Sequence, residues 1–490
     1  MSDDRDRDTD APRKSLDPVA EDMRRIGYEC VDRIVDHWQT LPEQMVGRRG
    51  NRSEYEALID EPLPELPVSL EDCLAYFFDR VVPGSTRVNH PRFHAHIPCP
   101  SSYAGALGGM LAAGTNLFSG SWLGGATICA LELTVLRWIA EMLGYDATAG
   151  GILTSGGSMA NLVGLATARA RSGRDALERG VIYVSREGHG SLNKAASILG
   201  FPAEAIREIN VDQRFQMRPD ELEAAIHADR SRGRLPLVVA ANAGTTNSGA
   251  IDPLPQLADL CAEHGLWFHI DAAYGGFAAI TPQARDRFQG MTRADSLTLD
   301  PHKWLYCPMG IGCALVRDPT LLEQAFSTQG SYLKDLPTDE VNFLERGPEL
   351  SRPARVLSVW MVIRSVGRAA LAAQIDQDMQ LARLAAELLG QDDRLEVVEP
   401  ELSIVAFRHR QGTQETESAR AARDAALMES TLASGELMLS STTLGGRSTL
   451  RLVVMNHRTT ADDIRRSVAR IRELIVNQNA DSARHDGLLR

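Results

Sequence analysis

The stretch Ser296-Leu297-Thr298-Leu299-Asp300-Pro301-His302-Lys303-Trp304 begins as an apolar run typical of a β-strand and ends in a polar turn. The turn presents Lys303 next to a histidine and near an aspartate. A lysine that forms a Schiff base needs such neighbours, because an ordinary lysine is charged and unreactive at neutral pH. Taken alone, Lys303 is more often a surface cation, so its role depends on the rest of the chain.

The composition points to a globular protein with small-molecule partners. The chain has 490 residues, 43% of them hydrophobic, and a formal net charge of -13. Nucleic acids and anionic membranes attract clustered Lys and Arg, so the acidic balance predicts neither as a partner. There is no run of 18 apolar residues and no apolar segment in residues 1–10, so we expect no membrane span, no signal peptide and a cytoplasmic protein. The seven cysteines form no C-x-x-C pair, so we expect reduced thiols and no structural zinc.

Short β-rich runs alternate with helical patterns through the middle of the chain. The β-rich runs are residues 181–185, 237–240, 267–270, 296–299 and 313–316, and the helices between them include 158–171 and 254–264. Such alternation predicts an α/β fold with a mostly parallel central sheet and helices on both faces. Ligands in these folds bind beyond the carboxyl ends of the strands, where we expect the candidate residues below to meet.

The pattern changes near both ends of the chain. The N-terminus is charged and poor in apolar side chains, and helical spacing then appears at 20–39 before a Pro-rich break. A long helical stretch at 356–389 precedes short runs that read as α+β. We therefore predict a disordered tail, 1–15, an N-terminal helical arm, 16–101, a large α/β domain, 102–370, and a small C-terminal α+β domain, 371–490.

The loop Thr154-Ser155-Gly156-Gly157-Ser158-Met159-Ala160-Asn161 places small residues at the start of a helix. Free backbone N–H groups and the helix dipole can hold an anion there. A glycine turn with a capping serine explains the same residues structurally. Neither GxxxxGK[ST] nor a GxGxxG before a helix occurs, so the pattern disfavours ATP and dinucleotides.

Three further polar residues follow strand-like runs. Asp271 ends the run in His269-Ile270-Asp271-Ala272-Ala273-Tyr274, Thr246 lies in the segment 243–253, and His189 follows the first β-rich run. Next to a pyridine ring, Asp271 would form a charge-assisted hydrogen bond that keeps the ring nitrogen protonated, and the imidazole of His189 could lie flat on such a ring. A capped turn, a polar turn and an ordinary loop histidine are the structural alternatives for the three positions.

The sequence resembles the fold-type I pyridoxal-phosphate (PLP) enzymes in the order of four residues: Gly157, His189, Asp271 and Lys303. Its HIDAAY and PHKW motifs resemble more narrowly those of the group II amino-acid decarboxylases. The resemblance implies that Lys303 forms the Schiff base with PLP, that Asp271 pairs with the pyridine nitrogen and that His189 stacks on the ring. It implies a cofactor site that also includes Gly156, Gly157, Ser158, Thr246, Ser296, Asp300 and His302. It further implies a fold-type I PLP-dependent transferase-like fold and a homodimer that binds its amino-acid substrate in shared active sites.

Two positions depart from the pattern of that family. Asp300 stands where many relatives have Asn, and since a carboxylate would repel a phosphate, we expect Asp300 to point elsewhere or to bind a neighbouring cation. Phe343, counted back from Trp360 without gaps, falls where aromatic amino-acid decarboxylases have a catalytic tyrosine that donates a proton. Phenylalanine cannot donate a proton. If another residue supplies it, His189 and the loop 332–342 are the next candidates.

The substrate pocket is less well defined by the sequence. The segment 89–103 resembles the substrate-binding segment of the family, and by the same resemblance we expect His96, Ile97, Cys99 and Arg451 near the substrate. His96 and Ile97 replace aromatic residues, so the pocket does not copy that of the DOPA-specific relatives. The two neighbouring histidines of this segment lack a third metal ligand, so we expect no metal site.

The sequence therefore predicts a PLP-dependent amino-acid decarboxylase, a carboxy-lyase that converts an L-amino acid to the amine and CO2. Phe343 motivates an alternative with the same cofactor, in which decarboxylation leads to oxidative deamination and yields an aldehyde, ammonia and hydrogen peroxide. A non-catalytic scaffold is disfavoured because the lysine, aspartate and histidine are all present, and a serine hydrolase because no G-x-S-x-G occurs.

Overall fold

The structure is a computed structural model that describes residues 16–173, 175–327, 335 and 339–488. The predicted disordered tail, 1–15, lies outside the described residues. The chain divides into two compact units, Met1–Arg87 and Val88–Arg490. The predicted end of the N-terminal arm at 101 is wrong, because the residues after Arg87 pair with the C-terminal region: Phe93 forms a β-bridge with Met438.

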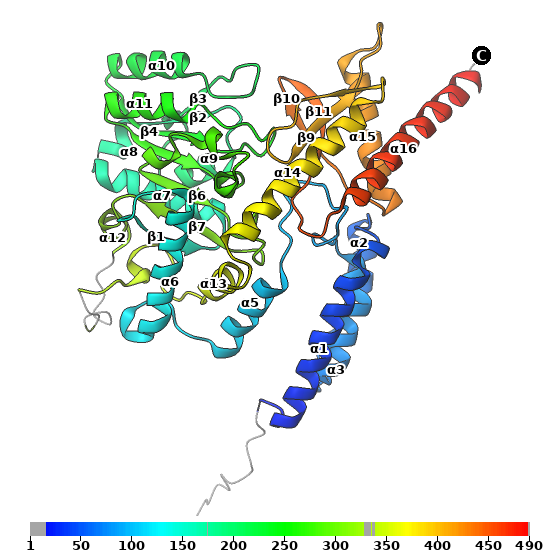
Figure 1. Cartoon of the computed structure of the whole chain (residues 1–490), viewed down its shortest axis with the longest axis horizontal. Coiled ribbons are helices and arrows are strands. Elements are labelled where there is room, and N and C mark those ends of the chain that lie inside the picture. Colours follow the sequence, from blue (N-terminus) through cyan, green and yellow to red (C-terminus); the bar gives the residue numbers. More distant parts are fainter. Residues whose placement is uncertain (1–15, 174, 328–334, 336–338, 489–490) are drawn as a thin grey trace, which may run out of the picture. The chain divides into compact units, whose positions relative to one another are not determined.

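The first unit is helical. It contains α1 (Ala20–Thr40), α2 (Arg52–Ile59) and α3 (Leu70–Tyr76), and short helical turns continue α3 to Gly84. An ion pair between Arg25 and Glu71 joins α1 to α3, which run side by side (Figure 1). The predicted helix at 20–39 is confirmed.

The second unit is built on a seven-stranded sheet. Its strands, in spatial order, are β1 (Gly150–Thr154), β7 (Gly312–Val316), β6 (Ser296–Leu299), β5 (Trp267–Asp271), β4 (Leu235–Asn242), β2 (Gly180–Ser185) and β3 (Ile206–Ile209). β7 is antiparallel to both neighbours and the pairs from β6 to β3 are parallel, which confirms the predicted mostly parallel α/β sheet. All the predicted strands are present. β1 and β3 were not predicted, because β1 begins with two glycines and two of the four residues of β3 are charged.

Helices cover this sheet, as strands buried on both faces require. α7 (Gly157–Ser172) packs along β1, β4, β5, β6 and β7, while α10 (Pro219–Ser231) and α11 (Leu254–His264) contact β4 (Figure 1). The remaining helices of this region are α5 (Tyr103–Thr115), α8 (Asp175–Arg179), α9 (Ser191–Ile198) and α12 (Thr320–Phe326). β1 runs in the same direction as β6, since both are antiparallel to β7, so the carboxyl ends of β1, β2, β4, β5 and β6 share one edge.

The helix α6 (Trp122–Leu143) belongs to the core and carries a buried charge. By length and composition alone it could cross a membrane, and among the described residues the bent helix pair at 356–390 is the one further candidate. One face of α6 is buried in the protein, and there Glu132 pairs with Arg352 at 2.7 Å, with neither side chain exposed. Gly144, with φ of 65°, ends the helix.

The single helical stretch predicted at 356–389 is wrong. It consists of α13 (Val356–Val366) and α14 (Arg368–Gly390), which are bent by 91° relative to one another. Between them Gly367 has φ of 80°, a conformation that favours glycine and ends α13. Apolar residues continue at helical spacing on both sides of this glycine, so the pattern alone does not reveal the bend.

The C-terminal part has its own sheet and core. The strands β8 (Leu395–Val397), β9 (Ile404–His409), β10 (Ser440–Leu444) and β11 (Arg447–Val453) form an antiparallel sheet in the order β10-β11-β9-β8. α15 (Glu417–Ser434) packs on β11, and α16 (Ala461–Leu488) packs on α14 and α15. α14 contributes to both this core and the main one, so the predicted boundary at 370/371 does not separate two compact units.

Candidate active site

A cavity of about 390 Å3 lies at the carboxyl ends of the central strands. Its wall includes the loop before α7, residues that follow β2 and β4, the last residue of β5 and the turn after β6. The residues predicted for the cofactor that line it are Gly156, Gly157, Ser158, His189, Thr246, Asp271, Asp300, His302 and Lys303. Parallel strands thus bring together segments that are far apart in the sequence.

Lys303 is paired with Asp300 inside this cavity. The Nζ atom of Lys303 lies 2.9 Å from Oδ2 of Asp300, and the two side chains are 15% and 4% exposed. Burial lowers the pKa of Lys303, but the negative charge and the hydrogen bond of Asp300 outweigh burial, so the pKa is raised above its usual value. The prediction that Asp300 binds a neighbouring cation is confirmed.

The turn that carries Lys303 is fixed by a buried carboxyl group. Trp304 Nε1 and Tyr306 OH donate hydrogen bonds to Asp378 Oδ2 at 3.1 and 2.8 Å, and Asp378 is fully buried on α14. The ring of Tyr274 stacks on Trp304 with 4.9 Å between the centroids. Because Trp304 follows Lys303 directly, these contacts fix the backbone from which the lysine projects.

Asp378 gives the fold a pH dependence. Burial raises its pKa from the ordinary value of 3.8 to about 7, so its contribution to stability is full below pH 3.8 and is lost as pH rises through about 7. Urea titrations of wild type and Asp378→Asn measure this effect. As pH rises from about 4 to 8, we expect the free energy of unfolding of wild type to fall relative to that of Asp378→Asn, by at most ~1.4 kcal/mol per pH unit. A difference between the two proteins that stays constant with pH would contradict this.

Asp271, the last residue of β5, presents a buried carboxylate to the cavity. Asn161 Nδ2 donates to Asp271 Oδ2 at 2.8 Å, and the backbone N–H of Ala273 donates to Oδ1 at 3.1 Å. With both oxygens held, the carboxylate has a fixed position from which it can accept a hydrogen bond from a protonated ring nitrogen.

Two histidines of the wall are oriented through their Nδ1 atoms. His189 Nδ1 lies 2.7 Å from Ser191 Oγ and accepts from the backbone N–H of Ser191 at 3.2 Å, while the ring is exposed at the cavity. His302 Nδ1 donates to the carbonyl of Ile311 at 2.7 Å. Burial lowers the pKa of His302, so its neutral ring leaves Nε2 unprotonated, 3.7 Å from Asp300 Oδ2.

The loop before α7 is suited to an anion. Gly156 has φ of 137°, which favours glycine, and Gly157 begins the helix. A Cβ atom at Gly157 would lie 2.7 Å from Asp300 Oδ2, so a side chain does not fit there. The first N–H groups of a helix have no partner within it, so Gly157 and Ser158 offer donors to a phosphate. An anion-binding loop, a paired lysine and a fixed carboxylate in one cavity together fit PLP.

Comparison with known proteins agrees with this geometry. Residues 53–410 match the model of the pyridoxal-dependent decarboxylase conserved domain. The chain belongs to this family. It is 37% identical over 465 residues to the aromatic-L-amino-acid decarboxylase of Bacillus atrophaeus, which covers 94% of this chain and 97% of the relative.

Two further similar proteins are an aldehyde synthase and a plant protein solved with PLP and tryptamine. The chain is 32% identical to the phenylacetaldehyde synthase of Arabidopsis thaliana, over 90% of this chain and 93% of that relative. It superposes on the crystal structure of Oryza sativa TDC with PLP and tryptamine with a TM-score of 0.90 and 30% identity, over 95% of this chain and 100% of that one. The protein is therefore a fold-type I enzyme with PLP as its cofactor, a carboxy-lyase that acts on an amino acid.

The phosphate-binding role that the resemblance implied for Ser296 is wrong. Ser296 is the first residue of β6, at the end of the strand that is remote from the Lys303 turn. Its hydroxyl lies 2.8 Å from Trp267 Nε1 and 2.8 Å from His269 Nδ1, and the side chain is buried outside the cavity wall. Ser296 therefore belongs to the interior of the sheet.

The catalytic position predicted for Phe343 is also wrong. The ring is 0% exposed, and the guanidinium carbon of Arg352 lies 5.0 Å from its centroid. Next to it, Leu344 N–H donates to the carbonyl of Gly120 at 2.8 Å. Phe343 thus anchors this segment in the core and does not line the cavity. Most of the loop 332–342, the next candidate, lies outside the described residues.

Arg451 and His96, predicted near the substrate, lie beside the cavity and not in its wall. Arg451 donates to the carbonyl of Thr246, a wall residue, and to Ser440 Oγ at 3.1 Å. Its buried Nε has no hydrogen-bond partner in the described part of the chain. Burial and the charge of Arg451 lower the pKa of His96, whose backbone N–H donates to Ser440 Oγ at 2.9 Å.

Ile97 and Cys99 also lie outside the wall. Ile97 is partly buried against the main core, and its carbonyl accepts from the Cys99 thiol at 3.4 Å. Burial raises the pKa of Cys99 to about 12, although the positive charge of Lys303 acts in the opposite direction. The substrate roles of these two residues stay predictions.

Ten residues of the wall were not predicted as site residues, among them Asn161, Tyr274 and Met309. Asn161 lies one helical turn after Gly157 on α7, so the same face of the helix presents both, and this spacing could have identified it. Met309 follows the Lys303 turn and is 66% exposed, but nothing in its sequence context marks it.

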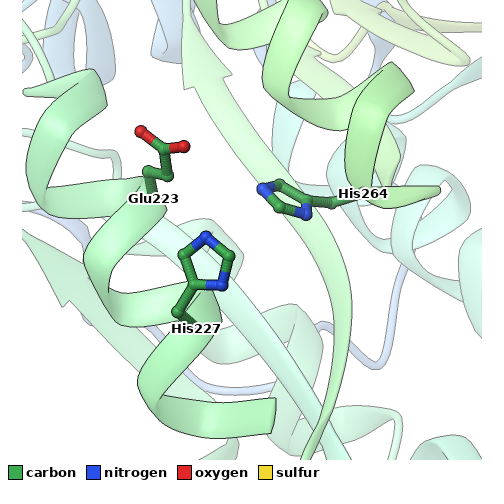
Figure 2. Close-up of side chains that lie close together, drawn as sticks. All are labelled: Glu223, His227 and His264. Carbon is green, nitrogen blue, oxygen red and sulfur yellow. The ribbon is translucent and has the colours of Figure 1, made fainter.

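Figure 2 shows a cluster of potential metal ligands formed by Glu223 and His227 on α10 and His264 at the end of α11. None of the three lines the cavity. Their ligand atoms lie within 4.8 Å of one another. Arg230 NH1 lies 2.8 Å from His264 Nδ1, and since a guanidinium only donates, this nitrogen is the acceptor. The proton of the neutral His264 ring then sits on Nε2, which leaves no free lone pair for a metal. The cluster is not a metal site in this arrangement.

Proposed function

We propose that this enzyme decarboxylates an aromatic L-amino acid to the corresponding amine and CO2. The observation that carries the proposal is the convergence of Lys303, Asp271, His189 and the loop before α7 in one cavity. The aromatic substrate class is supported by the relative from Bacillus atrophaeus, which is named for that activity and is 37% identical.

Each residue of the cavity has a distinct part in the proposed reaction. When bound, PLP supplies an electron-accepting ring that takes up the electron pair left behind by CO2. Lys303 holds the cofactor covalently, and Asp300 Oδ2, at 2.9 Å from Nζ, can take the proton that the amine must lose first. Asp271 would keep a proton on the ring nitrogen through a charge-assisted hydrogen bond. The N–H groups of Gly157 and Ser158 bind the phosphate.

The groups that orient the substrate would decide which of its bonds breaks. His189 is exposed in the cavity, where it would support the cofactor ring. We propose that Arg451, a buried cation bonded to the carbonyl of Thr246, supplies the positive charge that orients the substrate carboxylate.

A product screen tests the proposal. The PLP-loaded enzyme is incubated with each proteinogenic amino acid and with DOPA, and amines and CO2 are measured. We expect the highest kcat/KM for amine formation with aromatic amino acids. Equal or higher values with glutamate or another non-aromatic amino acid would overturn the substrate class, and the absence of amine and aldehyde from every substrate would overturn decarboxylation.

The alternative product class is an aldehyde, formed with ammonia and hydrogen peroxide, as the similarity to a phenylacetaldehyde synthase suggests. Its motivation from Phe343 is removed, because that ring is buried in the core. The one tyrosine of residues 327–342 is Tyr332, which lies outside the described residues. We propose that Tyr332 returns the proton to the carbon that lost CO2 and that the product is the amine.

Tyr332→Phe should shift the product from amine toward aldehyde and peroxide. A phenol with a pKa near 10 can donate a proton and a phenyl ring cannot, so we expect amine formation to fall by ~10²-fold or more. Amine, aldehyde and peroxide are assayed together, with and without oxygen. Phe343→Leu is the matched control, and its product ratio should equal that of wild type. Unchanged product ratios for Tyr332→Phe would mean that another group donates the proton.

We also propose that two copies of the chain form the enzyme. Large apolar side chains on α5, on the start of α6 and between them are 43–66% exposed in the single chain: Tyr103, Met110, Leu111, Leu117 and Leu123. Such clusters mark interfaces, and the exposed Met309 in the cavity wall supports active sites shared between copies. Sedimentation equilibrium should give twice the chain mass of 53.5 kDa, and a single-chain mass would overturn the dimer.

A further inference from the structure

Asn161 links the interior of the sheet to both groups that face the cofactor. It is 1% exposed on α7 and hydrogen-bonds three side chains, those of Asp271, His269 and Ser191. We propose that Asn161 is a positioning residue that, through one directed chain of hydrogen bonds, fixes both the Asp271 carboxylate and the proton position of His189. The inference rests on the roles proposed above for Asp271 and His189.

The direction in which the hydrogen bonds donate along this chain follows first from Asp271, at one end of it. A carboxylate only accepts, so the amide nitrogen of Asn161 faces Asp271 Oδ2, at 2.8 Å. The amide oxygen is then the acceptor for His269 Nε2 at 3.0 Å, and this nitrogen must carry a proton. Burial lowers the pKa of His269 to about 4, so the ring is neutral near pH 7 and its Nδ1 is unprotonated.

Trp267, at the opposite end of the hydrogen-bond chain, indicates the same direction of donation. Trp267 Nε1 can only donate, and it donates to Ser296 Oγ at 2.8 Å. The Ser296 hydroxyl in turn donates to His269 Nδ1 at 2.8 Å, the nitrogen that is unprotonated. The two ends therefore agree on the proton position of His269, and Ser296 acts as a link in this chain.

A branch of the chain reaches His189. The amide nitrogen of Asn161 also lies 2.8 Å from Ser191 Oγ and uses its second hydrogen there. The Ser191 hydroxyl is left to donate to His189 Nδ1 at 2.7 Å, next to the Ser191 backbone N–H at 3.2 Å. The proton of the neutral His189 ring then sits on Nε2. One amide thus sets the hydrogen-bonding state of two groups that face the cofactor.

Only an amide of this size supplies what the position needs, which is one acceptor and two donors. Leucine supplies neither. An aspartate at this position has no donor and places an oxygen where the amide nitrogen now lies, 2.8 Å from Asp271 Oδ2. Two carboxylates this close share one proton until the pH is high enough to remove it, and then repel each other. The other titratable groups near this position are His269, His189 and Lys303.

Asn161→Asp and Asn161→Leu, both similar in size to asparagine, separate positioning from packing. We measure kcat/KM for amine formation as a function of pH and, on the cofactor-free protein, the Kd of PLP from quenching of tryptophan fluorescence. Relative to wild type, the kcat/KM of Asn161→Asp should fall by ~10-fold or more as pH rises from about 6 to 9, and its Kd for PLP should rise by ~10-fold or more. The loss in Asn161→Leu should not depend on pH. If the profiles of Asn161→Asp run parallel to those of wild type, the inference is overturned.

A second measurement needs no change at Asn161 and decides the matter if the variants fail to fold. In wild-type holoenzyme labelled with 15N-histidine, NMR should find His189 and His269 with a protonated Nε2 and an unprotonated Nδ1, with signals assigned through His189→Gln and His269→Gln. A proton on Nδ1 of either ring would overturn the inference.

Asp271→Asn, measured in parallel, separates this inference from the proposed function. If Asp271→Asn keeps wild-type activity, the proposed role of Asp271 fails. If Asp271→Asn loses activity while Asn161→Asp follows the wild-type pH profile, only the positioning role of Asn161 fails.

Discussion

Lys303→Ala and Lys303→Arg are both expected to reduce amine formation by ~10³-fold or more, because neither side chain has a primary amine that can hold the cofactor covalently. Their effects on stability should differ. In the cofactor-free protein, Lys303 Nζ lies 2.9 Å from the carboxylate of Asp300, which is 4% exposed. Alanine leaves that carboxylate buried without its partner, at a cost of ~3–5 kcal/mol, whereas arginine keeps a cation next to it.

Steady-state amine assays and urea unfolding of the cofactor-free proteins measure the two effects separately. Lys194→Ala, at an exposed lysine of α9 outside the cavity, is the matched control and should leave both quantities near wild type. Appreciable amine formation by Lys303→Arg, which preserves the charge, would remove Lys303 from the covalent role.

Asp271→Asn should reduce kcat/KM by ~10²-fold or more, the size of effect expected for a lost charge-assisted contact to the reacting system. An amide can still hydrogen-bond the ring nitrogen but cannot stabilise its positive charge. The structure adds a second effect. Asn161 Nδ2 and the Ala273 N–H each donate a hydrogen bond to one oxygen of the Asp271 carboxylate. An amide in its place has one oxygen that can accept from one of these donors, and its NH2 group faces the other donor without forming a hydrogen bond. The affinity for PLP should therefore fall as well.

Asp229→Asn provides the control for the loss of a buried carboxylate elsewhere. Asp229 is 1% exposed on α10 and pairs with Arg207 at 2.6 Å, outside the cavity wall. This change should lower stability and leave kcat/KM within a few-fold of wild type. Asp271→Asn with near-wild-type kcat/KM and PLP affinity would show that Asp271 does not have the assigned role.

The central strands and the chemically distinctive residues of the cavity wall could be predicted because such residues follow apolar runs in the sequence. Asp271, His189 and Lys303 each follow a β-rich run, and parallel strands bring such positions to one edge. The same rule argues against a cofactor contact for Ser296, because Ser296 begins β6 and so lies at the end of the strand opposite the site. The four residues of β6, at about 3.3 Å per residue, separate it from the site. Its assignment came from resemblance alone.

Other features depend on which atoms meet in the folded chain. The ungapped count that placed Phe343 in the site contains no information on burial, and the ring lies under Arg352 in the core. The bend at Gly367 interrupts no apolar spacing. The role of Asn161 depends on contacts with three side chains from two other segments, β5 and α9, which the sequence does not place together.

The most direct test of the central claim is the location of the bound cofactor. The chain contains four lysines, Lys14, Lys194, Lys303 and Lys334, so the possible attachment sites are few. The PLP-loaded protein is reduced with borohydride and digested, and mass spectrometry locates the phosphopyridoxyl group. We predict the loss of the visible absorption band and the group on Lys303 alone. The group on another lysine, or on none, would contradict the account.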